Sequence, residues 1–137
     1  MKKNREEAER WLKQAEYNLE VAESNLANEF YAAACFMCEQ TVQMALKSFL
    51  ILKTGRSPLG MHSIQKLAEK SAQFDHKFKE VVDFGKVLDR YYIPTRYPDA
   101  LTSPAVPFET FTMKDARQAF DKSTEIVSYV RNSFEAL

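Results

Sequence analysis

One segment, residues 30–53, carries apolar side chains on nearly every side, and it constrains the fold of this 137-residue chain most. A helix that is hydrophobic all round lies buried among other elements, whereas a surface helix keeps its apolar residues on one stripe. Gly55 predicts the end of the helix, because glycine readily takes the left-handed conformation of a C-cap. We therefore expect a central helix with other helices packed around it. Its apolar residues are Phe30, Tyr31, Ala32, Ala33, Ala34, Phe36, Met37, Val42, Met44, Ala45, Leu46, Phe49, Leu50 and Leu52.

Four further segments are expected to form the surrounding helices. Apolar residues recur with a 4-3-4-3 spacing over 5–27, which predicts one continuous stripe along a helix. Two helices are expected over 62–73 and 77–92, and the second ends before Pro94, since proline disfavours the helical conformation of the residue before it. The last helix begins at a capping box formed by residues 112–115, with Asp in place of the usual Glu.

The chain shows no alternating apolar pattern typical of strands and no internal repeat. The elements predict an all-α fold: an antiparallel up-and-down bundle of four long helices plus one short helix, with a long proline-rich loop before the last helix. At this length we expect a single domain over 1–137. Glycine at position 85, inside helix 77–92, costs about 1 kcal/mol relative to alanine. We therefore expect another helix or backbone to approach Gly85 closely, and a dimer seam along this helix or the central one would fit.

The overall charge excludes a broad nucleic-acid or membrane surface, because 19 Lys and Arg balance 19 Asp and Glu. Segment 47–70 is locally basic, however, and is compatible with a local anion site. The charged N-terminus lacks the apolar core of a signal peptide, and no stretch reaches the length of a membrane span. We expect a cytoplasmic protein with no membrane partner and with reduced cysteines.

Cys35 and Cys38 form a C-x-x-C motif in the middle of the expected central helix. Redox motifs of this kind lie at helix N-termini, and zinc requires four ligands. We interpret both cysteines as buried small hydrophobes, and we expect no metal and no cofactor.

The loop over 91–112 is the segment in which we expect function. Connections in helical bundles usually run roughly 2–8 residues, so this loop is long. Four of the chain's five prolines restrict it, and it is richer in aromatic residues than a solvated linker. We predict that Arg96 holds a phosphate through its planar guanidinium, that Tyr97 stacks or shapes the pocket, and that Asp99 faces the ligand. The alternative is that Arg96 pairs with Asp99 or Asp89 and that the tyrosines pack the loop onto the bundle.

His62 is the second candidate, at the start of helix 62–73, where backbone N–H groups favour an anion. Lys47, near the end of the central helix, is expected to line the same anion site. The alternative is that His62 caps its own helix or fills a loop pocket. Arg56 and His62 also have an Arg-x5-His spacing, and the pair could supply the base and the cation for metal-independent RNA cleavage.

With these pieces placed, the chain resembles the HEPN domain family, named for its occurrence in higher eukaryotes and prokaryotes. The string Tyr-Ile-Pro-Thr-Arg-Tyr-Pro-Asp over 92–99 is the most specific feature of the resemblance. The other features are Trp11-Leu12 with Ala15, Leu19 and Ala22; Phe30-Tyr31-Ala32-Ala33-Ala34 through Gln40 to Ala45-Leu46-Lys47; and His62-Ser63-Ile64 with Leu67, followed by Leu88-Asp89.

The resemblance implies a four- or five-helix bundle, commonly dimeric and often encoded beside a minimal nucleotidyltransferase. Some HEPN proteins are metal-independent ribonucleases that act as toxins through an Arg-x(4–6)-His motif, and others are linked to nucleotide binding. This chain departs from the nuclease pattern, because no histidine follows Arg96.

We therefore expect a nucleotide- or RNA-phosphate-binding and protein-interaction module that forms a homodimer. Its expected partner is a minimal nucleotidyltransferase, as in a toxin–antitoxin pair. The alternative is a metal-independent endoribonuclease, with Arg56 and His62 or Arg96 and His62 as candidate catalytic residues. A third interpretation is a structural dimer whose loop merely covers the core. The nuclease requires His62 beside an arginine, whereas the binding module does not.

Overall fold

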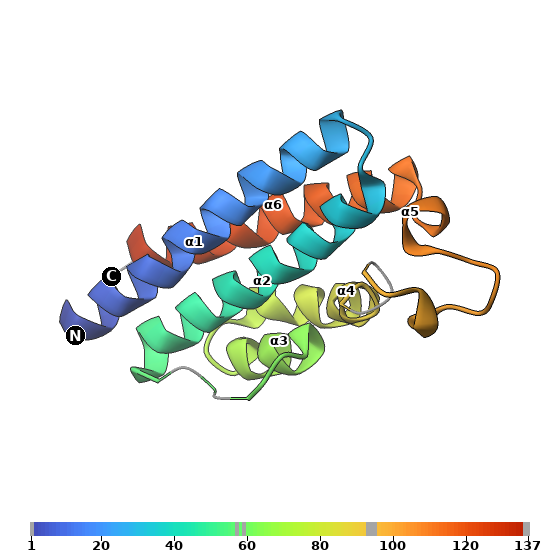
Figure 1. The fold of residues 1–137 in the computed structure, drawn as a ribbon. Coiled ribbons are helices and arrows are strands. Elements are labelled where there is room, and N and C mark those ends of the chain that lie inside the picture. Colours follow the sequence, from blue (N-terminus) through green and yellow to red (C-terminus); the bar gives the residue numbers. More distant parts are fainter. Residues whose placement is uncertain (1, 57, 59, 93–95, 136–137) are drawn as a thin grey trace.

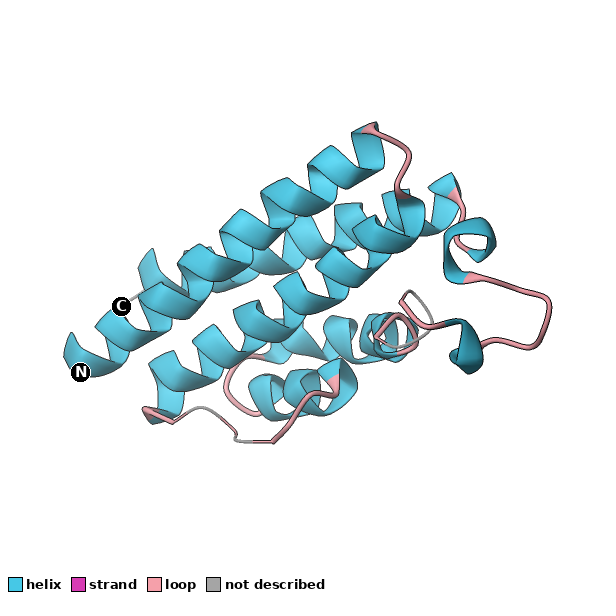
Figure 2. Ribbon diagram, viewed as in Figure 1, coloured by secondary structure: helices cyan, strands magenta, loops and turns pink. Residues whose placement is uncertain are grey.

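Three long helices lie side by side along the length of the protein in a computed structural model, which describes residues 2–56, 58, 60–92 and 96–135. They are α1 (Lys2–Ala27), α2 (Tyr31–Thr54) and α6 (Met113–Glu135), and the two chain ends lie at the same end of the bundle (Figure 1). The described residues contain helices and loops but no strand (Figure 2). The predicted all-α bundle is confirmed.

Two shorter helices, α3 (Ile64–Ala72) and α4 (Lys79–Asp89), pack against each other and against α2. The helix predicted over 77–92 is shorter in the structure, where α4 covers only Lys79–Asp89. A 3₁₀ turn over His76–Phe78 precedes α4, because the carboxylate of Asp75 accepts a hydrogen bond from the Lys77 N–H at 3.1 Å and starts a separate turn. The position of the fourth long helix is thus shared by α3 and α4.

The expected long loop is not without structure. It contains a 3₁₀ turn, η2 (Pro98–Ala100), and one helical turn, α5 (Pro107–Thr110), and each of them begins with a proline. The capping box before α6 is confirmed. The Asp115 carboxylate accepts a hydrogen bond from the Thr112 N–H, and the Thr112 hydroxyl accepts one from the Asp115 N–H. In the part of the chain that the structure describes, no helix is long and apolar enough to cross a membrane.

The central helix α2 supplies most of the core. It buries 16 of its 24 residues, and its Phe49 ring packs 4.4 Å from the ring of Phe78, which lies just before α4. Gly55 ends the helix in the left-handed conformation, as predicted. Cys35 and Cys38 are both buried, and burial raises the pKa of each thiol to about 12, as expected for small core residues.

The carboxylate of Asp89 joins α4 to the start of α3. It accepts hydrogen bonds from Ser63 Oγ at 2.9 Å, from the N–H of Ile64 at 2.6 Å and from the N–H of Gln65 at 3.2 Å. One turn earlier on α4, a Cβ added to Gly85 would lie 2.8 Å from the Gln65 backbone nitrogen. The expected close approach at Gly85 is confirmed, and it is made by α3 of the same chain, so this glycine requires no dimer seam.

Gly85→Ala is expected to destabilise the protein, although alanine favours a helix by about 1 kcal/mol. The added methyl group would displace the backbone of α3, and overpacking of this kind costs roughly 1–3 kcal/mol. Urea denaturation followed by circular dichroism should give a lower free energy of unfolding for Gly85→Ala than for Lys86→Ala, a change at an exposed position of the same helix. A Gly85→Ala variant at least as stable as the wild type would contradict this close packing.

Candidate functional site

A stripe of polar residues crosses the buried, otherwise apolar α2. Glu39, Gln43 and Lys47 follow one another at intervals of four residues, so they lie on one face of the helix. All three are buried, and Glu39 is only 1% exposed. Gln43 Nε2 donates to Glu39 Oε1 at 2.9 Å, and Lys47 Nζ donates to Gln43 Oε1 at 3.1 Å. Because buried polar groups are costly unless they are paired, the stripe forms a connected network.

His62 adds to this network from the segment before α3. Its Nδ1 lies 3.2 Å from Gln43 Oε1, the oxygen that also accepts from Lys47, and the two form a hydrogen bond when Nδ1 carries the proton. The predicted proximity of Lys47 and His62 is therefore present, with Gln43 between them. Sequence reasoning did not include Gln43 among the site residues.

The helix that His62 was expected to start begins two residues later, at Ile64, with Ser63 as its N-cap. The N–H groups of Ile64 and Gln65 donate to Asp89. A ligand at His62 would therefore be held by side chains and not by the helix N-terminus, and anion binding at His62 stays a prediction.

Arg96 lies among three aromatic rings. Its guanidinium carbon is 4.5 Å from the ring centre of Phe36, 4.8 Å from that of Tyr92 and 5.0 Å from that of Tyr97. Its Nε donates to the Tyr92 carbonyl at 3.0 Å, and within the described residues the two Nη atoms donate to no protein atom. Cation–π contacts of this kind hold the planar group without using its terminal N–H donors.

The alternative pairing of Arg96 with Asp99 or Asp89 is not formed, since the described residues contain no ion pair of Arg96 and Asp89 is bound to the start of α3. Tyr92 instead links Arg96 to His62. The His62 and Tyr92 rings are stacked, with centres 6.4 Å apart and planes inclined by 18°. Arg96 and His62 therefore contact the same tyrosine ring.

The charges of the site are set by burial. Burial raises the pKa of Glu39 to about 7, with a smaller contribution from Asp89, while hydrogen bonds from Gln40 and Gln43 and the charge of Arg96 act in the opposite direction. Burial lowers the pKa of Lys47, and Glu39 offsets part of that effect. Near neutral pH, Glu39 thus carries only part of a negative charge, so it offsets the charge of the Arg96 cation only in part.

Two predicted residues lie outside this cluster. Arg56 is exposed and lines a separate cavity of about 310 Å³ with Lys70 and Phe74. The Arg-x5-His spacing of Arg56 and His62 therefore does not bring the two side chains to one site. Asp99 is exposed in η2. The described residues contain no group of three His, Cys, Asp or Glu side chains placed to hold a metal ion.

Sequence reasoning also missed Glu39 and Phe36 as parts of the site. The available signal for Glu39 was a run of polar residues at intervals of four in a helix that is otherwise apolar. Phe36 had no such signal, because its role depends on where the loop after α4 places Arg96.

The fold and the site define an all-α bundle in which an arginine held by aromatic rings lies beside a buried polar network. The chain belongs to the HEPN domain family, whose model matches residues 8–133. Members of this family generally bind RNA or act as ribonucleases.

Two solved structures resemble the chain over nearly its whole length. TT1696 from Thermus thermophilus is 37% identical, with a TM-score of 0.82 over 91% of this chain and 96% of that one. ST0689, described as an archaeal HEPN homologue, is 29% identical, with a TM-score of 0.74 over 93% of this chain and 97% of that one. Human sacsin is 27% identical over 129 residues, which are 92% of this chain but 3% of sacsin.

Glu39→Gln should make stability less dependent on pH. The folded wild type keeps the proton of Glu39 up to about pH 7, whereas the unfolded chain releases it near 4.5. The stability that this retained proton contributes is complete below the pKa of the unfolded chain. It is lost as pH rises between these two values, and the free energy of unfolding then falls by at most about 1.4 kcal/mol per pH unit. Urea denaturation at several pH values across this interval should show the loss reduced in Glu39→Gln.

Glu20→Gln is the control for this experiment, because it removes an exposed carboxylate of α1. Its stability should follow the pH dependence of the wild type. A Glu39→Gln variant that loses as much stability as the wild type between acid and neutral pH would contradict a retained proton on Glu39.

Proposed function

We propose that the protein binds the phosphate groups of RNA or of a nucleotide through Arg96. The observation that carries this proposal is the guanidinium itself, which is held by three aromatic rings while its Nη atoms donate to no protein atom within the described residues. A planar guanidinium with free N–H groups matches two phosphate oxygens at once. The ordering of Arg96 by the rings lowers the entropic cost of that contact.

Neighbouring residues support the same proposal. Tyr97 is 51% exposed beside Arg96, so its ring is accessible to stack on a base. The His62 ring stacks on the Tyr92 ring, and His62 and Lys47 share Gln43 Oε1 as a hydrogen-bond partner, so we expect both to line the same site. The carboxylate of Asp89 is bound to the start of α3 and does not pair with Arg96. Asp99 stays a predicted ligand contact.

Arg96→Ala should weaken the binding of a short single-stranded RNA at least about tenfold, because hydrogen bonds to a charged group contribute roughly 1.5–3 kcal/mol. Arg96→Lys should restore only part of the affinity, since lysine keeps the charge but not the planar fork. Fluorescence anisotropy of a labelled oligonucleotide measures both effects. In Arg96→Ala, the slope of log affinity against log salt concentration should fall by about one, the value for one lost phosphate contact. Arg117→Ala, at an exposed arginine of α6, is the control. Equal affinities for Arg96→Ala and Arg117→Ala would refute the assignment.

A metal-independent endoribonuclease is the second candidate, and the ring of Tyr92 favours it. That ring contacts both the imidazole of His62 and the guanidinium of Arg96, the groups that this candidate requires as general base and as phosphate-binding cation. If this candidate is correct, RNA incubated with the protein in the presence of EDTA, which removes divalent metal ions, should be cleaved. His62→Ala should abolish the cleavage products. RNA that stays intact while it binds would leave the binding module as the function.

For assembly, we propose a homodimer that pairs with a minimal nucleotidyltransferase in the cytoplasm. The sequence features shared with dimeric HEPN proteins support this proposal. Light scattering of the purified protein should give twice the mass of one chain, and a minimal nucleotidyltransferase encoded beside it should co-purify with it. A monomer that does not retain such a protein would contradict both parts.

A further inference from the structure

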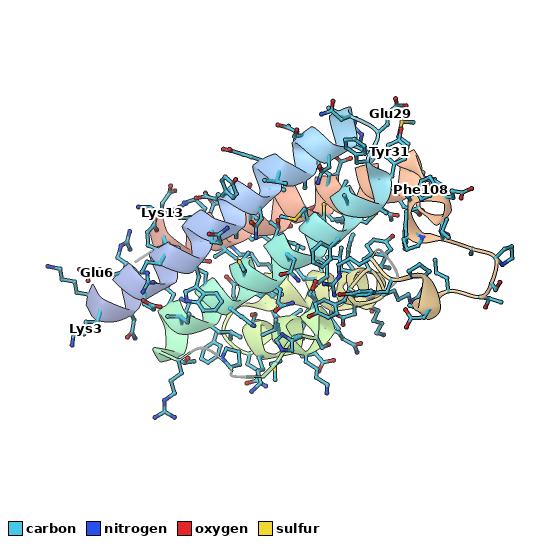
Figure 3. The ribbon with its side chains drawn as sticks, in the orientation of Figure 1. Lys3, Glu6, Lys13, Glu29, Tyr31 and Phe108 are labelled. Atoms are coloured by element: carbon cyan, nitrogen blue, oxygen red, sulfur yellow. The ribbon has the colours of Figure 1, made fainter. Side chains whose placement is uncertain are left out.

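An open apolar groove of about 590 Å³ lies beside Arg96, where the start of α2 faces α5. Phe30, Phe36 and Phe108 are among the residues that line it. Tyr31 lines the groove as well, and Figure 3 shows Tyr31 and Phe108 at the same end of the bundle. The volume falls within the range of roughly 300–1,000 Å³ that is typical of small-molecule sites.

Two phenylalanines of the groove are strongly exposed. Phe30 is 63% exposed and Phe108 is 76% exposed, and they come from segments that lie far apart in the sequence. Apolar surface that gathers at one place without being buried is typical of an interaction site. Aromatic rings on such a surface favour a flat aromatic ligand, because they offer their faces for stacking.

The groove is continuous with the phosphate site proposed above. Arg96 lines the groove, and Phe36 contributes to its wall while its ring contacts the Arg96 guanidinium. An acid, Glu29, lines the groove as well, and its carboxylate accepts a hydrogen bond from the Tyr31 hydroxyl at 3.5 Å. A phosphate is therefore attracted to Arg96 and repelled by Glu29, so the apolar part of a ligand is directed into the groove.

We propose that this groove takes an unpaired base of an RNA strand whose adjacent phosphate is bound by Arg96. The inference rests on the proposed function and specifies its substrate as single-stranded RNA. A base within a duplex is stacked on its neighbours and cannot enter a groove of this kind, whereas an unpaired base can turn outward and stack on aromatic side chains.

The test compares a single-stranded RNA hexamer with an abasic hexamer that has the same phosphates, both titrated by fluorescence anisotropy. Phe108→Ala should weaken binding of the RNA at least about fivefold, the loss expected for one stacked base. It should leave the abasic hexamer unaffected, whereas Arg96→Ala should weaken both. Met113→Ala is the matched control, since Met113 is an exposed apolar residue, 59% exposed, that does not line the groove. Circular dichroism confirms that each variant is folded.

The outcomes separate this inference from the proposed function. If Arg96→Ala loses affinity while Phe108→Ala behaves like Met113→Ala, the groove assignment is overturned and the phosphate site stands. Equal losses on the two hexamers in Phe108→Ala would also overturn it. If Phe108→Ala changes the oligomeric mass but leaves RNA binding unchanged, the groove is a contact between protein copies. That result would overturn its assignment as a base site. If the wild type binds neither hexamer, the RNA-binding part of the proposed function fails, and this inference fails with it.

Discussion

The carboxylate of Asp89 is the interaction from which the arrangement of this site follows. The first N–H groups of a helix have no partner within the helix, and here Asp89 accepts from two of them and from the Ser63 hydroxyl. It also places a negative charge at the positive end of the α3 dipole. Gly85, one turn earlier, allows the two backbones to approach closely enough for these bonds to form.

Both halves of the site extend from this contact. His62 immediately precedes the N-cap of α3, while Tyr92 lies three residues beyond Asp89, the last residue of α4. When α3 and α4 are fixed to each other, the His62 and Tyr92 rings can stack, and Tyr92 in turn presents its ring and carbonyl to Arg96. The local capping interaction at Asp89 therefore helps to fix the relative positions of His62 and Arg96, the two side chains that we propose contact the ligand.

Local signals in the sequence were sufficient for the bundle but not for the site. The αL residue at Gly55 and the capping box at Thr112–Asp115 depend on neighbours in the chain, and both were predicted. The 3₁₀ turn over His76–Phe78 was not predicted, so the start of the helix after it was placed too early. This start depends on the separate turn that the Asp75 carboxylate caps. Periodicity places a polar residue such as Gln43 on a face of a helix, but it cannot show that His62 will approach that face.

The central helix gives the site two environments of opposite character. Glu39, Gln43 and Lys47 form a polar network because burial leaves each of them dependent on the others for hydrogen bonds. Phe36, three residues before Glu39, faces Arg96 and the open groove instead. Since one turn of α2 separates these environments, a cation held at Phe36 lies at the boundary between a buried polar side, where burial disfavours further charge, and an open apolar side. A nucleotide unit has the same division, with a charged phosphate joined to an aromatic base. In the proposed function, the helix that supplies most of the core therefore also contributes to the site through Phe36.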